Sequence, residues 1–449
     1  MTSLEKNILE DSQISLTIEP NKGISEYRKY IEQLHQTIDS GSLANNEAVN
    51  KALDGQAYEF LRNSISLEAR REVGAFFTST DLSTKIALEA SKFLKDNDII
   101  IDPACGAGSL LIAIAEQLKL EENLEKTLRA WGEKIYGFDL HDEFVSATKM
   151  RLALLAAKRC GEDLLNIEYL DHFPNIKKGD ALKNIETISK ANCILINPPY
   201  VSIMSPQNCQ WSSGKISSAA LFLDLICDAM KPGCKVYAIL PEVIRCGSRY
   251  NKLRNKISAQ TTLLFSNSIG LFDTWTDVDV FILALQKNDN LREPPHNFFT
   301  FKNNNNKKIR DFFDIRIGPV VPHRDLEVGK KYPYIDVKSL VAWDESFQAN
   351  DCRRYGGTVF KTPFVAIRRN SRPNDKYRTV ATIVSSPAGY IAVENHLIVA
   401  IPLQGAYEEC LKLMDVLKDK RTNVHLNERM RCRHLTVSSV KEIPWWDNP

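Results

Sequence analysis

Short apolar runs rich in Ile and Val alternate with apolar segments of helical spacing between residues 74 and 285. The runs predict strands at 98–102, 134–139, 192–197, 235–240, 263–265 and 278–285, with helices at 110–118, 144–157 and 219–230. Strands that alternate with helices in this way are typical of a mostly parallel sheet covered on both faces. We therefore expect an α/β domain in this part of the chain.

The flanking segments have different patterns. Residues 1–70 read as a helical segment, because apolar residues recur at helical spacing over 24–34 before Gly41, and a second helical run covers 46–63. Four asparagines at 303–306 suggest a connector. Beyond them lie short β-like runs at 363–367 and 379–384 and a helical run at 408–418. We expect three parts: 1–70, an α/β domain over 71–300, and a mixed α+β domain over 301–449.

The composition is that of an ordinary globular protein, with 43% hydrophobic and 25% charged residues. This excludes a wholly disordered chain, a collagen-like fibre and a small disulfide scaffold. Because no run of about 18 apolar residues occurs and residues 1–10 are polar, we expect a cytoplasmic protein without a membrane span. The 10 cysteines form no Cys-x-x-Cys pair, so we expect no structural metal.

The net charge of +2 conceals an asymmetry. Residues 301–449 contain 25 Lys and Arg against 17 Asp and Glu, whereas the rest of the chain is net acidic. This contrast suggests a phosphate-bearing partner for the C-terminal part, although a solvated basic surface is the alternative. The densest window, 352–378, has eight basic residues and one acidic residue, interleaved with aromatics. Its candidate nucleic-acid contacts are Arg353, Arg354, Arg368, Arg369, Arg372, Lys376 and Arg378.

A glycine loop, Asp102-Pro-Ala-Cys-Gly-Ala-Gly108, follows the first predicted strand and precedes a predicted helix. Ligands of open α/β sheets bind at the carboxyl ends of strands, near the point where strand order reverses. Gly106 and Gly108 would let the backbone approach a ligand closely. The loop therefore indicates a nucleotide-like site, and the alternative is an ordinary turn.

Two acidic residues follow later strands. Asp139 ends the second predicted strand, where a carboxylate can accept hydrogen bonds from ribose hydroxyls. The alternative for Asp139 is a helix N-cap. Asp180, in a Gly-Asp pair, can accept from an exocyclic adenine amino group, and the alternative is a turn residue.

The motif Asn197-Pro-Pro-Tyr200 ends an apolar strand about 90 residues after the glycine loop. Two prolines cannot extend the strand, so they fix the backbone and present Asn197 and Tyr200 at the sheet edge. As an isolated tetrapeptide it would be only a turn.

Together these motifs resemble the amino-group DNA methyltransferases that use S-adenosylmethionine, in the gamma arrangement of restriction–modification systems. The loop with Asp102, Ala104, Gly106 and Gly108 resembles the cofactor loop of that family, and Asn197–Tyr200 resembles its catalytic motif in the form associated with adenine N6. Residues 74–81, with Thr78, resemble the other cofactor segment, and Ser79 stands where the family usually has Pro.

The resemblance implies a Rossmann-like class I methyltransferase domain, a C-terminal target-recognition domain and S-adenosylmethionine as cofactor. It implies that Asp139 binds the ribose and Asp180 the adenine amino group of the cofactor. Phe222 would pack on that adenine and Phe272 would lie near the target base, and core packing is the alternative for both. The Asn197 side chain and the Pro198 carbonyl would accept the two amino protons of a flipped-out adenine, which stacks on Tyr200.

The partners implied are duplex DNA and a separate restriction endonuclease. Three alternatives share the catalytic motif: transfer to RNA adenine, to a glutamine side-chain amide, or to cytosine N4. The basic C-terminal part and the early Thr78 segment argue against the glutamine class. An alternative of another class is a non-catalytic DNA-binding subunit with a methyltransferase-like fold, against which the intact motifs argue.

Overall fold

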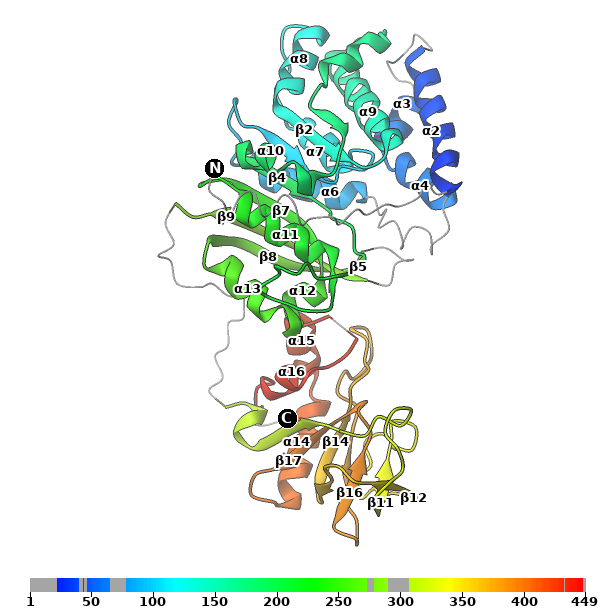
Figure 1. Cartoon of the computed structure of the whole chain (residues 1–449), viewed down its shortest axis with the longest axis vertical. Coiled ribbons are helices and arrows are strands. Elements are labelled where there is room, and N and C mark those ends of the chain that lie inside the picture. The colour runs from blue at the N-terminus through cyan, green and yellow to red at the C-terminus, as the bar shows by residue number, and fades with distance from the viewer. Residues whose placement is uncertain are drawn as a thin grey trace. The chain divides into compact units, whose positions relative to one another are not determined.

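A seven-stranded sheet with the strand order β3-β2-β1-β4-β7-β9-β8 organises the N-terminal part of the chain (Figure 1). The strands from β3 to β7 pair in parallel, and β9 runs antiparallel to both of its neighbours. The strands are β1 (Ile100–Asp102), β2 (Ile135–Asp139), β3 (Ile176–Lys178), β4 (Cys193–Ile196), β7 (Lys235–Pro241), β8 (Thr261–Leu271) and β9 (Asp279–Lys287). The expected α/β sheet is confirmed, and β3 is the short strand expected before Asp180.

Helices cover both faces of this sheet. This follows because neighbouring strand residues, whose side chains point to opposite faces, belong to different hydrophobic clusters. Ile101 packs in the cluster that includes α11, whereas Ile100 packs in the cluster that includes α6 and α7. On the first face lie α10 (Ile185–Lys190), α11 (Ser218–Ala229) and α13 (Asn251–Ser258). On the second face lie α6 (Thr80–Ser91), α7 (Ser109–Ala115), α8 (Leu124–Lys134) and α9 (Asp142–Cys160).

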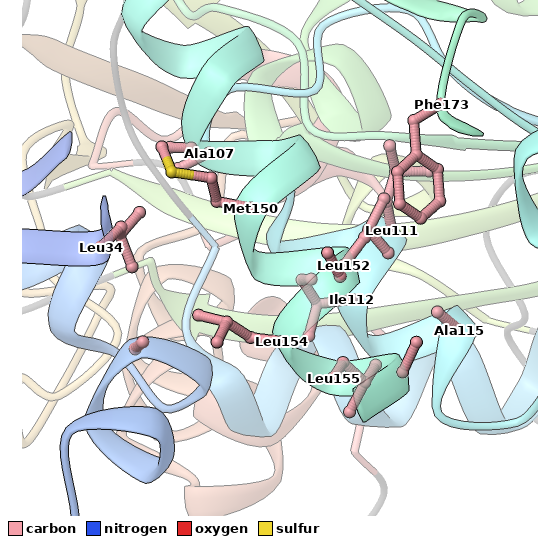
Figure 2. Close-up of a cluster of buried hydrophobic side chains, with 14 of the residues drawn as sticks. Leu34, Ala107, Leu111, Ile112, Ala115, Met150, Leu152, Leu154, Leu155 and Phe173 are labelled. Atoms are coloured by element: carbon pink, nitrogen blue, oxygen red, sulfur yellow. The ribbon is translucent and has the colours of Figure 1, made fainter. Parts of the chain in front are cut away.

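Three further helices complete this side of the unit: α2 (Lys22–Asp39) and α3 (Glu47–Leu53) pack on α9, and α4 (Gln56–Ser64) packs on α2 and α3. Figure 2 shows part of their shared core, in which Leu34 of α2 lies with side chains of α7 and α9. The single helix expected over 46–63 is two helices, because Gly55 takes a left-handed φ of 57° between them. Shorter elements are β5 (Ser202–Met204), β6 (Lys215–Ser217), α12 (Glu242–Cys246) and 3-10 turns η1 (Ile167–His172), η2 (Ala181–Lys183), η3 (Ser248–Tyr250) and η4 (Ile309–Asp311).

The C-terminal part contains two four-stranded sheets around one core, which includes Phe364, Val393 and Val399. The first sheet has the order β10 (Phe313–Ile317), β17 (Leu397–Pro402), β14 (Phe364–Arg368), β15 (Ala381–Val384). The second has the order β12 (Asp351–Tyr355), β11 (Lys330–Ile335), β16 (Tyr390–Val393), β13 (Phe360–Lys361). The helices are α14 (Tyr407–Lys418), α15 (Lys420–Arg429) and α16 (Val437–Lys441).

This computed structural model describes residues 22–39, 43, 47–64, 78–272, 278–289, 307–431 and 433–446. The chain divides into two compact units, Met1–Phe298 and Phe299–Pro449. The connector expected at 303–306, Gly41 and residues 74–77 of the Thr78 segment lie outside the described residues. Of the helices that are described, none is long and apolar enough to cross a membrane. The described His, Cys, Asp and Glu side chains form no group of three suited to a metal ion.

Candidate active site

The strand order reverses between β1 and β4: the chain adds β2 and β3 on one side of β1, and β7 on the far side of β4. Such a point leaves a crevice at the carboxyl ends of the strands, which is where open α/β sheets bind ligands. The glycine loop leaves β1 at this edge, and Asn197 leaves β4 beside it. The fold therefore gathers the sequence motifs at one place.

The glycine loop depends on left-handed backbone at two positions, with φ of 52° at Gly106 and 82° at Gly108. Gly108 also begins α7, and a Cβ atom there would lie 2.8 Å from the Thr148 side chain. Thr148 Oγ1 in turn donates to the Gly106 carbonyl at 2.8 Å. The loop therefore needs glycine at residue 108 for its conformation and for its close contact with α9.

Asp139 ties the glycine loop to the end of β2. Its Oδ2 accepts a hydrogen bond from the Gly106 N–H, and its Oδ1 accepts one from the His141 N–H, both at 3.0 Å. The alternative N-cap role does not apply, because His141 is the N-cap residue of α9. Asp139 remains partly exposed, and each carboxylate oxygen has lone pairs left for further donors.

Two acidic groups give this loop a distinctive electrostatic character. Asp102 is 2% exposed and accepts from the Ala104 N–H at 3.0 Å. Burial raises the pKa of Asp102 to about 8, against the effect of the Ala104 N–H, and the nearby Asp139 raises it further. Burial likewise raises the pKa of Asp139, although the His141 and Gly106 N–H groups oppose that shift. A cationic ligand would favour the ionised form of both carboxyls.

Asp180 caps the short turn η2, since its side chain accepts from the Leu182 N–H at 3.0 Å. The preceding Gly179 N–H donates to the Asp139 carbonyl at 2.8 Å, so this loop is joined to the end of β2. Asp180 thus has the turn role that was its alternative. Its contact with an adenine amino group remains a prediction.

The Asn197 amide is oriented by two side chains. Its Nδ2 donates to Thr78 Oγ1 at 3.1 Å, and its Oδ1 accepts from the Tyr200 hydroxyl at 2.7 Å. The same hydroxyl lies 3.2 Å from the Ile239 carbonyl oxygen of β7. Thr78 is buried, and the following Ser79 has a φ of −64°, the value that a proline ring would fix. Ser79 therefore has a φ that a proline at this position could also adopt.

The start of α11 holds the segment after Asn197. Ser218 Oγ accepts from the Val201 N–H at 3.0 Å and donates to the Pro199 carbonyl, and the Ser218 N–H donates to the Val201 carbonyl at 2.8 Å. Pro198 is buried. These contacts anchor the motif on its C-terminal side, so the backbone that presents Asn197 is held from both ends.

Two aromatic side chains expected near the target base contact each other. The Tyr200 and Phe272 rings meet edge to face, with centroids 5.9 Å apart. Burial raises the pKa of the Tyr200 hydroxyl well above its usual value, so the side chain is neutral at physiological pH. Phe222 of α11 is 7% exposed and packs in the hydrophobic cluster between this helix and the sheet. Its contact with the cofactor therefore remains a prediction.

The structure corrects the expected DNA contacts at Arg353 and Arg378. Arg353 is 8% exposed and donates to Glu327 at 3.0 Å and to the Asp325 carbonyl at 2.7 Å. Arg378 is fully buried and donates to Asn427 Oδ1 at 3.0 Å. A buried guanidinium needs acceptors within the protein, and both arginines have them, although the buried Arg353 Nε makes no hydrogen bond to a described residue. These two side chains therefore stabilise the C-terminal unit instead of facing a ligand.

The remaining basic candidates differ in exposure. Arg368 and Arg369 are half-buried and donate to the Leu340 and Asn395 carbonyls, at 2.7 and 2.9 Å. Arg354, Arg372 and Lys376 are exposed.

Sequence reasoning missed Lys331, which is exposed directly opposite Arg354 on the neighbouring strand. Lys331 lies before the basic window, and the pairing register that brings it opposite Arg354 is a property of the fold.

This sheet order, with a glycine loop after its first strand, defines a class I methyltransferase fold. The chain belongs to the N-6 DNA Methylase family, whose model matches residues 50–313. A protein of Methanocaldococcus jannaschii described as a type II restriction enzyme and methyltransferase is 26% identical in an alignment of length 236, and the match covers 38% of this chain and 20% of the relative. The type I restriction enzyme MpnII methylase subunit of Mycoplasma pneumoniae is 28% identical in an alignment of length 179, and the match covers 38% of this chain and 30% of the relative.

The matched regions therefore span less than a third of either relative. Among solved structures, the type IIG restriction endonuclease BpuSI aligns with a TM-score of 0.42 and 13% identity, over 94% of this chain and 70% of that chain.

Proposed function

We propose that this protein transfers a methyl group from S-adenosylmethionine to the N6 amino group of an adenine in duplex DNA, as the modification enzyme of a restriction–modification system. The observation that carries the proposal is the Asn197 amide, fixed by Thr78 and Tyr200 beside the glycine loop. Membership of the N-6 DNA Methylase family supports adenine N6 as the acceptor. A separate endonuclease would be the partner in such a system.

The residues at the sheet edge fit the proposed cofactor. Asp139 is partly exposed and can accept from ribose hydroxyls. Asp180 follows Gly179, whose N–H donates to the Asp139 carbonyl, which supports the proposal that Asp180 accepts from the adenine amino group. Burial raises the pKa values of Asp102 and Asp139, and a nearby cation would stabilise their ionised forms. This suits a ligand with sulfonium and ammonium charges. Bound here, S-adenosylmethionine would supply an electrophilic methyl group.

The Asn197 motif suits the poor nucleophilicity of an exocyclic amino nitrogen, whose lone pair is delocalised into the ring. Asn197 Oδ1 has a second lone pair besides the one that Tyr200 uses, and the Pro198 carbonyl supplies another acceptor. When both amino N–H groups donate hydrogen bonds to these acceptors, the amino nitrogen is favoured in a tetrahedral geometry and its lone pair is localised. That lone pair attacks the methyl carbon in line as the carbon–sulfur bond breaks, and the extra amino proton then passes to water. Catalysis is positioning and electrostatics, without a covalent enzyme intermediate.

The target adenine must leave the DNA helix to reach Asn197, at a cost of a few kcal/mol for lost pairing and stacking. Stacking on an aromatic ring is worth about 1–3 kcal/mol per base, which offsets part of that cost. We assign this role to Tyr200, and its hydrogen bond to Asn197 and its edge-to-face contact with Phe272 support the assignment.

The C-terminal unit would supply the DNA contacts from its exposed cations. Lys331 and Arg354 are opposite each other on β11 and β12, and like charges directly opposite across two strands repel. A phosphate placed between them would remove that repulsion and release counterions from the DNA. Arg372 and Lys376 add exposed charge in the same unit. We therefore assign phosphate contacts to these four residues.

The test is transfer of labelled methyl groups by the purified full chain to duplex DNA, with RNA of matched sequence and a glutamine-containing protein as competitors. We expect label in duplex DNA, recovered as N6-methyladenine after hydrolysis. Label recovered as N4-methylcytosine, or mainly in RNA or protein, would contradict the proposed acceptor. Failure to bind S-adenosylmethionine would favour a non-catalytic DNA-binding subunit.

A further inference from the structure

Arg151 of α9 connects two segments that are far apart in sequence. The side chain is 3% exposed, and its hydrogen bonds go to main-chain carbonyls. Its Nε donates to Ala52 at 2.8 Å and its Nη2 to Leu53 at 3.3 Å, while its Nη1 donates to Ala107. One guanidinium thus holds the end of α3 and the glycine loop together.

The acceptors explain why a buried cation is tolerated at this point. Ala52 and Leu53 are the last residues of α3, where helix carbonyls have no partner within the helix. The carboxyl end of a helix also attracts positive charge. Ala107 lies between the two left-handed glycines of the loop, so its carbonyl direction defines the loop conformation. Arg151 therefore supplies charged donors to these carbonyls, of which Ala52 also accepts from the Tyr30 hydroxyl at 3.4 Å.

The same face of α9 controls a second carbonyl of the loop. Thr148, one turn before Arg151, donates to Gly106 at 2.8 Å. Figure 2 shows Ala107 beside Met150 of α9, and both belong to the cluster that also contains Leu34 of α2. Two successive loop carbonyls are thus fixed by polar donors from α9, with apolar packing around them.

The turn after α3 also reaches the other side of the site. Asp54 Oδ1 accepts from Thr80 Oγ1 at 3.0 Å, and Thr80 begins α6 two residues after Thr78, the partner of Asn197. The end of α3 and the residue after it therefore contact both the glycine loop, through Arg151, and the start of α6, next to the segment that orients the Asn197 amide.

We propose that Arg151 is a positioning residue for the cofactor: it docks the end of α3 against the glycine loop and holds the Ala107 carbonyl in the conformation that binds S-adenosylmethionine. This inference rests on the proposed function. Without the guanidinium, the Ala107 carbonyl loses its buried donor and the loop can turn away. The loss should appear as weaker cofactor binding, because Arg151 does not contact the Asn197 motif that performs the transfer.

The test compares Arg151→Met and Arg151→Lys with a matched control, Arg159→Met. Arg159 is on the same helix and also donates to two main-chain carbonyls, those of Ala115 at 2.7 Å and Leu118 at 2.9 Å at the end of α7. Both Met variants remove a guanidinium that joins α9 to a neighbouring segment. Only Arg151 touches the glycine loop, so a general loss of stability would affect both variants alike.

The readouts are calorimetric affinity for S-adenosylmethionine, steady-state kinetics on duplex DNA and melting temperature, all with the full chain. We expect Arg151→Met to weaken cofactor binding at least tenfold, with kcat at saturating cofactor within threefold of the parent. Arg159→Met should change the affinity less than twofold. Arg151→Lys keeps the charge but loses the three-pronged geometry, so it should weaken binding by an intermediate factor.

Equal cofactor affinity in the Arg151 and Arg159 variants would overturn the inference. A fall in kcat without a change in KM for the cofactor would also overturn it, because it would place Arg151 in the chemical step. If Arg151→Met does not fold, Arg151→Lys carries the same comparison, and unchanged affinity in the Lys variant is the contrary result. If the parent itself fails to bind S-adenosylmethionine, the proposed function fails, and the inference about Arg151 fails with it. If the parent binds the cofactor and the Arg151 variants bind it equally well, the inference alone fails.

Discussion

The Tyr200 hydroxyl donates a 2.7 Å hydrogen bond to Asn197 Oδ1, and Thr78 accepts from the nitrogen of the same amide. Asn side chains can flip, and these two partners select one orientation. The oxygen is thereby placed to accept from a second donor, as the proposed reaction requires. Tyr200 thus has two separable parts: a hydroxyl that orients Asn197 and a ring available for stacking.

Removing the hydroxyl alone should have a modest effect. Tyr200→Phe loses a hydrogen bond worth about 0.5–1.5 kcal/mol, while Thr78 still holds the amide nitrogen. We expect kcat to fall by about two- to tenfold, with little change in the KM for DNA. Single-turnover kinetics with saturating cofactor measure this directly, and a loss as large as that of Asn197→Ala would contradict it.

Removing the ring as well should weaken the capture of the target base. Tyr200→Ala loses stacking worth about 1–3 kcal/mol in addition to the hydroxyl. A fluorescent 2-aminopurine at the target position reports flipping, and its signal should fall in the Ala variant and persist in Tyr200→Phe. Equal signals in the two variants would show that the ring does not hold the base.

Gly108 should be far less replaceable than another glycine of similar conformation. Gly108→Ala combines a left-handed φ of 82° with a contact of 2.8 Å to Thr148. Gly161, at the end of α9, has a φ of 72°, and a Cβ atom there would meet nothing within 4 Å. The control Gly161→Ala should cost about 1–2 kcal/mol of unfolding free energy and leave cofactor affinity intact. Gly108→Ala should cost more and weaken cofactor binding, as measured by urea unfolding and calorimetry; similar losses in both variants would refute the close contact.

Asp102 should make the stability of the N-terminal unit fall as pH rises. Its pKa is about 8 in the folded chain against an ordinary value of 3.8, so the folded state keeps a proton that the unfolded state loses. Between about pH 4 and pH 8 this lowers the unfolding free energy, by at most about 1.4 kcal/mol per pH unit. Asp102→Asn should flatten that dependence in urea titrations at pH 6 and pH 8. Parallel curves for the parent and the variant would exclude the raised pKa.

The exposed pair Lys331 and Arg354 should contribute to DNA affinity without contributing to stability. Each Ala substitution should weaken duplex binding and reduce the slope of affinity against salt by about 1. Arg316→Ala is the control, because Arg316 is exposed but already paired with Asp314 at 2.7 Å. Salt titrations by fluorescence anisotropy test the difference, and unchanged slopes for the Lys331 and Arg354 variants would place the DNA elsewhere.

The sequence predicted the parts of the fold that depend on local pattern. Strands such as β4 are continuous buried runs, and the two prolines after Asn197 mark where β4 ends. No apolar run marks β3, because Ile176 is its single buried residue, although a short strand was expected before Asp180. The position of the glycine loop was also readable, because a strand, two glycines and an apolar helix follow one another directly.

Roles that depend on distant partners could not be read in this way. Arg353 and Arg354 are neighbours in sequence, yet one is buried and the other exposed because successive residues of β12 point to opposite faces. The role of Arg151 could not be predicted from the sequence, because its acceptors are main-chain carbonyls of alanine and leucine residues, and such side chains do not indicate a hydrogen-bond partner. Exposure and main-chain contacts are set by the assembled fold.

The central claim is adenine N6 methylation of duplex DNA through Asn197. The most direct test expresses the full chain in a host without DNA methylation and sequences its genomic DNA by a method that detects modified bases, beside an Asn197→Ala control. We expect N6-methyladenine at one recurring motif with the parent chain and none with the variant. Unmodified DNA from both, with purified protein that binds S-adenosylmethionine, would contradict it and make RNA the leading substrate.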